Sequence, residues 1–121
     1  MKLQHLTLLL LMGLFLVSCN KDREDPEITI TSPANNTEIS AGDSFAFQVE
    51  VTDNEGLDLI TFTDGSGIDE SITTFDDPMS HKLNYNITTN QDFPAGELIM
   101  TVEATDLEGN VAKEDVTIIV N

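Results

Sequence analysis

Acidic and amide side chains gather in two predicted turns of this chain. They are Asp53, Asn54 and Glu55 in the first turn, and Asp106, Glu108 and Asn110 in the second. Carboxylate and amide oxygens are what hard cations such as Ca²⁺ bind, and such a site needs neither His nor Cys. We take all of these residues except Asn54 as candidate calcium ligands. In the competing interpretation, Asp, Asn and Gly are there only because they form turns well.

The segments between such turns predict β-strands. From Glu27 onward, apolar and polar residues alternate with a period of two, and no stretch has the period of a helix. The clearest case is Phe45, Phe47, Val49 and Val51. Seven strands are expected in the 95 residues from 27 to 121. Their approximate ranges are 27–31 with a short continuation at 37–40, 45–52, 57–63, 68–75, 79–88, 98–104, and a last strand carrying Val116 to Val120.

Seven short strands with regular turns indicate an all-β fold, a seven-stranded antiparallel immunoglobulin-like β-sandwich of two sheets. An antibody-type domain is excluded, because the chain has no Trp and no pair of cysteines for the bridge between the sheets. In such a sandwich the two acidic turns lie at the same end as the start of the first strand. That end would then also hold Asp25 and Glu27.

Three stretches resemble bacterial immunoglobulin-like domains of surface proteins. They run from Pro26 to Pro33, from Val49 to Leu57 and from Val102 to Asn110. The resemblance implies an envelope or surface module and specifies fold more than activity. The acidic turns also resemble those of cadherin-like domains, which implies calcium binding at that end.

The N-terminus resembles the signal of a bacterial lipoprotein. Lys2 precedes an apolar run from Leu6 to Val17, and Leu16, Val17, Ser18 and Cys19 form a lipobox-like quartet that contains the one cysteine of the chain. The run of 12 residues is shorter than the roughly 20 that a helix needs to span a bilayer. We expect cleavage after residue 18, recognition through Leu16, Val17 and Ser18, and lipidation, including palmitate, at Cys19.

A charged tether, residues 19–26, would then join the lipid to the sandwich at 27–121. Lys21, Asp22, Glu24 and Asp25 resemble the acidic export signal of surface lipoproteins in the Bacteroidota, although Arg23 interrupts the acidic run. The resemblance implies an outer-membrane protein anchored at the cell surface. A tether without a sorting role, on the periplasmic face, is the alternative.

Composition narrows the classes of function. The chain has 22 acidic and 5 basic residues, a formal charge of −17, so it lacks the basic clusters that nucleic acid needs. His81 is the one histidine beyond the leader, and we assign it a structural role at the edge of the core. With Cys19 acylated, no thiol remains for catalysis and no disulfide can form. The remaining enzymatic alternative is a hydrolase that uses carboxylates. We expect that the protein is not an enzyme.

The leading hypothesis is a non-enzymatic, lipid-anchored envelope module that acts in adhesion or as an accessory of a surface complex. The alternatives are a calcium-binding cadherin-like module and a glycan-binding component of a polysaccharide-uptake system. Because the lipid would be at the N-terminus, the acidic end would face the membrane. The opposite end, expected to comprise Pro33 to Asp43, Asp64 to Gly67 and Thr89 to Gly96, would meet a protein or glycan partner.

Overall fold

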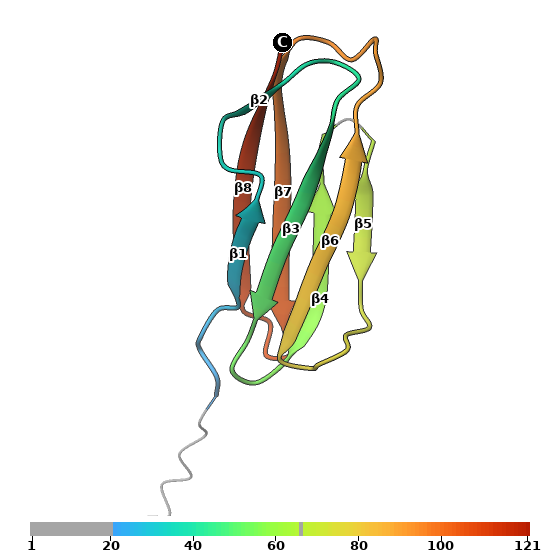
Figure 1. Ribbon diagram of the computed structural model, residues 1–121. Helices are drawn as coiled ribbons and strands as arrows, with labels where there is room; N and C mark the ends of the chain where they lie inside the picture. The colour runs from blue at the N-terminus through green and yellow to red at the C-terminus, as the bar shows by residue number, and fades with distance from the viewer. Residues whose placement is uncertain (1–20, 66) are drawn as a thin grey trace, which may run out of the picture.

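The computed structural model of the protein describes residues 21–65 and 67–121, in which all regular structure is β-strand (Figure 1). None of these residues lies in a helix long and apolar enough to cross a membrane. The strands are β1 (Glu27–Ser32), β2 (Thr37–Ile39), β3 (Ser44–Thr52), β4 (Leu57–Thr63), β5 (Asp69–Ile72), β6 (Ser80–Thr88), β7 (Gly96–Asp106) and β8 (Val111–Val120).

Two sheets make up the fold. One has the strand order β1-β3-β6, and the other has the order β2-β8-β7-β4-β5. Every pair is antiparallel except β2 with β8, which is parallel. The two sheets pack face to face, as Figure 1 shows. The prediction of an immunoglobulin-like β-sandwich is therefore confirmed.

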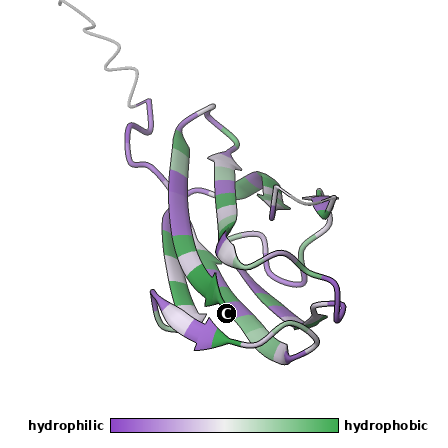
Figure 2. Cartoon of the chain, turned by 90° about the horizontal axis from the view of Figure 1, so that it is seen from above, coloured by the Kyte–Doolittle hydropathy of each residue, from purple (hydrophilic) through white to green (hydrophobic). Residues whose placement is uncertain are grey.

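The core lies between the two sheets and follows the period-two pattern of the sequence. Along the long strands, hydrophilic and hydrophobic bands alternate (Figure 2), because successive side chains of a strand point to opposite faces. The Phe62 ring lies between two others, with its centroid 5.6 Å from that of Phe47 and 4.8 Å from that of Tyr85. β3 buries Phe45, Phe47, Val49 and Val51, and β7 buries Leu98, Met100, Val102 and Ala104.

The first predicted strand differs from the expectation, because it divides between the two sheets. β1 pairs with β3, whereas residues 37–39 cross to the other sheet and pair with the end of β8 as an eighth strand. Between them, Asn36 N donates to Thr117 O at 2.7 Å, and Thr117 N donates to Asn35 Oδ1 at 2.9 Å. The Pro33 to Asn36 loop therefore lies beside β8. We had predicted that it lies at the far end of the sandwich, and for these residues the prediction is wrong.

Antiparallel pairing brings three parts of the chain to one end of the sandwich. Glu27 pairs with Thr52, and Leu57 pairs with Asp106. The start of β1 therefore lies beside the β3–β4 turn, and that turn lies beside the β7–β8 turn. We call this the tether end, because residues 21–26 reach the sandwich there, opposite the C-terminus (Figure 1).

Candidate metal centre

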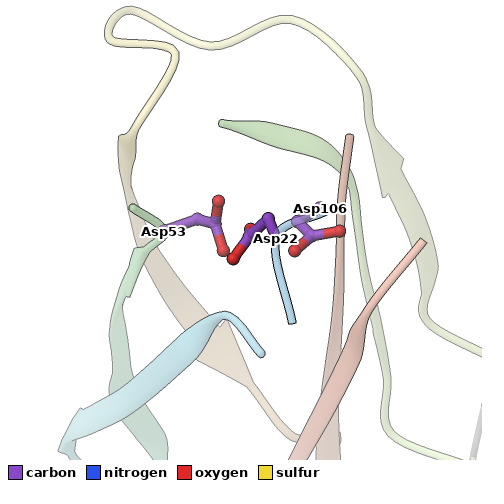
Figure 3. A group of neighbouring side chains, drawn as sticks. All are labelled: Asp22, Asp53 and Asp106. Atoms are coloured by element: carbon purple, nitrogen blue, oxygen red, sulfur yellow. The ribbon is translucent and has the colours of Figure 1, made fainter. Parts of the chain in front are cut away.

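Three aspartates from distant parts of the sequence meet at the tether end. Asp22 comes from the tether, Asp53 from the β3–β4 turn and Asp106 from the end of β7. One carboxylate oxygen of each lies within 4.8 Å of those of the other two. Figure 3 shows the Asp22 side chain between those of Asp53 and Asp106. We call this group the aspartate cluster.

Asp53 is held by its own turn through one oxygen only. Its Oδ2 accepts hydrogen bonds from the backbone N–H of Glu55 at 2.9 Å and of Gly56 at 2.7 Å. The turn needs Gly56 because its φ is +138°, which side-chain-bearing residues rarely adopt. The side chain is only 7% exposed, and its buried Oδ1 has no hydrogen-bond partner among the described residues. The Asp53 side chain extends toward that of Asp22 in the aspartate cluster (Figure 3).

Asp106 has the most complete hydrogen bonding of the three. Its Oδ1 accepts from the backbone N–H of Glu108 at 2.9 Å and of Asn110 at 2.8 Å, and its Oδ2 accepts from Asn110 Nδ2 at 2.7 Å. Burial raises the pKa of Asp106, but the hydrogen bonds from Asn110, Glu108 and Gly109 outweigh it and leave the pKa below its ordinary value. Asp106 is therefore an ionised carboxylate at neutral pH.

Asp22 docks the tether onto both turns. Its Oδ1 accepts from Asn54 Nδ2 at 3.1 Å and from the backbone N–H of Glu24 at 3.0 Å. Its main-chain oxygen accepts from Asn110 Nδ2 at 3.4 Å. Its Oδ2 is buried and has no hydrogen-bond partner in the described part of the chain. Like Asp53, Asp22 thus has one carboxylate oxygen that accepts hydrogen bonds from N–H groups of the protein. Its other oxygen is buried and has no hydrogen-bond partner among the described residues.

The cluster concentrates negative charge that the described residues do not neutralise. Within residues 21–65 and 67–121, none of the three carboxylates forms an ion pair. Like charges at about 4 Å repel by roughly 4 kcal/mol in a medium of effective dielectric constant 20. A bound cation would replace this repulsion with attraction. It would also be coordinated by the two buried oxygens that have no hydrogen-bond partner among the described residues.

The structure sorts the candidate calcium ligands into two groups. Asp53, Asp106 and Asn110 come together, whereas the side chains of Glu55 and Glu108 are exposed and lie outside the cluster. Both glutamates contribute their backbone N–H groups instead, each to the aspartate two residues before it. Their acidity had suggested a ligand role, but in both turns the sequence Asp-x-Glu-Gly builds a hydrogen-bonded support for the aspartate.

Asp22 is the member that sequence reasoning missed for this site. Asp25 and Glu27 lie beside the β3–β4 turn, as expected, and line one hollow with Asp53, but both are exposed and lie outside the aspartate cluster. Asp22 had been assigned only to the export signal, whose other residues, Lys21, Glu24 and Asp25, are exposed. The available signal was the short distance along the chain from Asp22 to the start of β1, but no periodic pattern fixes where the tether folds back.

The remaining site predictions fall elsewhere. Leu16, Val17, Ser18 and Cys19 lie outside the described residues. His81 is half-buried at the start of β6, and its ring meets that of Phe75 edge-on at a centroid distance of 5.3 Å, in keeping with a structural role.

Comparison with known proteins supports the fold. A family described as "Bacterial Ig domain" matches residues 26–102. The fibronectin(III)-like modules of CbhA from Clostridium thermocellum superpose with a TM-score of 0.55 at 20% identity, over 78% of this chain and 94% of theirs. The PKD domain of an M14-like peptidase from a Thermoplasmatales archaeon gives a TM-score of 0.50 at 15% identity, over 79% of this chain and 92% of its own. No curated protein matches the chain.

Proposed function

Because the chain belongs to the bacterial Ig domain family, we propose that it is a non-enzymatic, lipid-anchored module of the cell envelope whose tether end binds a calcium ion. Bacterial Ig domains are generally non-catalytic and typically extracellular, and the fold here is that of fibronectin-like and PKD-like modules. The calcium ligands are the carboxylates of Asp22, Asp53 and Asp106.

The observation that carries the proposal is the unpartnered Oδ1 of Asp53. A buried polar atom without a partner costs about 1–3 kcal/mol, and more when it is charged. Asp53 Oδ1 is buried in a side chain that is only 7% exposed, and the Asp53 carboxylate lies within 4.8 Å of two further carboxylates. An arrangement so costly without a ligand is typical of a cation site.

The chemistry of the donors favours calcium over other metals. All three candidate ligands are oxygens, which excludes the sites rich in nitrogen and sulfur that zinc prefers. Ca²⁺ accepts irregular sets of six to eight oxygens, whereas Mg²⁺ demands near-ideal octahedral geometry. A flip of the Asn110 amide would turn its oxygen toward Asp106 and Asp22 and add a fourth protein ligand, with water completing the shell.

The cellular role that we propose rests on which end of the domain faces the membrane. With a lipid at Cys19, the tether end faces the membrane and the far end faces outward, toward a protein or glycan partner in adhesion or in a surface complex. At that far end, a hollow of about 240 Å³ has apolar walls from Ile68, Ile87, Phe93 and Leu98. Asp64 and Asn90 line its polar side.

Isothermal titration of the full-length chain, purified in mild detergent, with CaCl₂ tests the calcium site. We expect one site with a Kd of about 0.1–1 mM, the range of extracellular calcium modules. Asp53→Asn and Asp106→Asn should abolish the heat of binding. Asp115→Asn, which removes an exposed charge from β8, is the matched control and should leave it unchanged. Equal binding by all four proteins would refute the site.

A further inference from the structure

We propose that calcium works as a latch: its binding clamps the tether onto the sandwich, and its loss releases the tether. This inference rests on the proposed calcium site and goes beyond it. One ligand, Asp22, belongs to the tether, whereas Asp53 and Asp106 belong to the sandwich. An ion that binds all three must therefore join two parts of the chain that are otherwise held together by the covalent link to β1 and two hydrogen bonds from the turns.

The contacts of the tether itself are too weak to hold it in place. Apart from the hydrogen bond within the tether, Asp22 is attached by Asn54 Nδ2 at 3.1 Å and Asn110 Nδ2 at 3.4 Å. Each such bond adds little net free energy, because it replaces a hydrogen bond to water. Fixing the backbone of the four residues from Asp22 to Asp25 loses conformational entropy at every one of them. Ordering residues 22–25 therefore costs more free energy than the two hydrogen bonds contribute, even before the repulsion among the three carboxylates is counted.

A cation reverses this balance. It removes the repulsion at the cluster and adds bonds to the two buried oxygens that have no other partner, Asp22 Oδ2 and Asp53 Oδ1. Pro26 is already buried at the start of the sandwich, so the segment that orders is short. Lys21, Arg23, Glu24 and Asp25 stay exposed around Asp22. The bound ion is thus what decides whether residues 22–25 are docked or free.

The latch changes how far the domain can stand from its anchor. With the tether free, eight residue steps separate Cys19 from Glu27, the first residue of β1, a reach of at most about 29 Å. With Asp22 clamped, only Asn20 and Lys21 remain free, and the reach between Cys19 and the docked Asp22 falls to at most about 11 Å. Calcium would therefore hold the domain close to the membrane in a restricted orientation, and chelation would let it move outward and turn.

Trypsin can report the state of the latch, because Lys21 and Arg23 flank Asp22. The other basic residues of the described chain, Lys82 and Lys113, lie within strands, where they are poor sites for cleavage. In 10 mM CaCl₂ (about ten times the upper-range Kd), we expect the full-length chain in mild detergent to be cleaved in the tether at least tenfold more slowly than in EGTA. Asp53→Asn, digested alongside, should be cleaved at the fast rate in both buffers, which controls for the effect of calcium on trypsin.

The outcomes separate the latch from the site. If calorimetry shows calcium binding but the tether is cleaved at one rate in both buffers, fast or slow, the latch is refuted and the site stands. If the chain binds no calcium, the proposed function itself fails. Asp22→Asn keeps the Oδ1 acceptor and removes the charge, so it should bind calcium at least tenfold more weakly and be cleaved fast in calcium. Wild-type affinity in Asp22→Asn would also overturn the latch.

Discussion

Asp53 and Asp106 belong to one cluster because the turns that carry them are hydrogen-bonded to each other. Leu107 N, next to Asp106, donates to Gly56 O in the Asp53 turn at 3.0 Å, and Leu57 pairs with Asp106 at the end of the sheet. Both turns have the sequence Asp-x-Glu-Gly, and in each the backbone N–H two residues after the aspartate binds one of its oxygens. The two carboxylates are thus positioned by backbone geometry before any ion arrives.

The first prediction concerns the charge of Asp53. In Asp53→Asn, the remaining oxygen still accepts from Glu55 and Gly56, while the new NH₂ group donates to the cluster and one negative charge is lost. In EGTA the variant should therefore unfold at the same temperature as the wild type or higher. In 10 mM CaCl₂, the wild type should gain about 1.5–2.7 kcal/mol, or roughly 5–15 °C, for a Kd of 0.1–1 mM. The variant should gain nothing, as measured by thermal denaturation.

Asp53→Ala is the control for this comparison. It removes the acceptor for both N–H groups of the turn as well as the charge, so it should lose about 1–2 kcal/mol in either buffer. If Asp53→Asn were as unstable in EGTA as Asp53→Ala, repulsion in the cluster would not be the cost that we assign to it.

The second prediction concerns pH and Asp106. Its pKa lies below the ordinary value of 3.8, so hydrogen bonding to the ionised form stabilises the fold above about pH 4, and this contribution is lost as the pH falls toward the lowered pKa. Asn110→Ala removes one of those donors and should cost about 1–2 kcal/mol at pH 7 in EGTA. The difference between the two proteins should shrink below pH 4. A difference that stays constant from pH 7 to pH 2.5 would contradict this account of Asp106.

The third prediction uses two glycines with the same backbone angle. Gly56 and Gly67 both have a φ of +138°, so an alanine at either position should cost about 1–3 kcal/mol of backbone strain. Gly56 also donates to Asp53 Oδ2, and a Cβ there would lie 2.8 Å from Leu107 Cδ1, whereas nothing lies within 4 Å at Gly67. Chemical denaturation should show destabilisation of both variants, and calorimetry should show weaker calcium binding only for Gly56→Ala. Equal effects on binding would mean that the turn does not position Asp53.

The fourth prediction tests the anchor. Cys19→Ala should move the protein from the membrane fraction to the soluble fraction of the envelope, as followed by fractionation and immunoblotting, because the acyl chains supply the membrane affinity. Glu24→Ala combined with Asp25→Ala should retain the lipid and calcium binding but lose exposure to protease on intact cells. Asp22 is kept in that variant, so that export and cation binding are not changed together. A wild-type protein shielded from protease on intact cells would contradict surface display.

The sequence could predict those parts of the fold that depend on local alternation. β3 and β7 alternate cleanly, and their apolar residues are the ones buried, because side chains of a strand point to opposite faces in turn. β2 could not be predicted as a separate strand, since its three residues are defined by pairing with the distant end of β8. Asp53 and Asp106 could be predicted from the sequence, because acidic residues are common in turns. Asp22 was not, because only the folded end of the sandwich shows where the tether docks.

A crystal structure of the protein grown with 10 mM CaCl₂ would reveal the ion and its ligands. We expect one calcium ion within about 2.3–2.6 Å of the carboxylate oxygens of Asp22, Asp53 and Asp106, identified by its anomalous signal. The Asp53 Oδ1 and Asp22 Oδ2 atoms, which otherwise have no partner, should be among its ligands. A well-ordered aspartate cluster without an ion at that calcium concentration, or an ion bound elsewhere, would contradict the proposed calcium site.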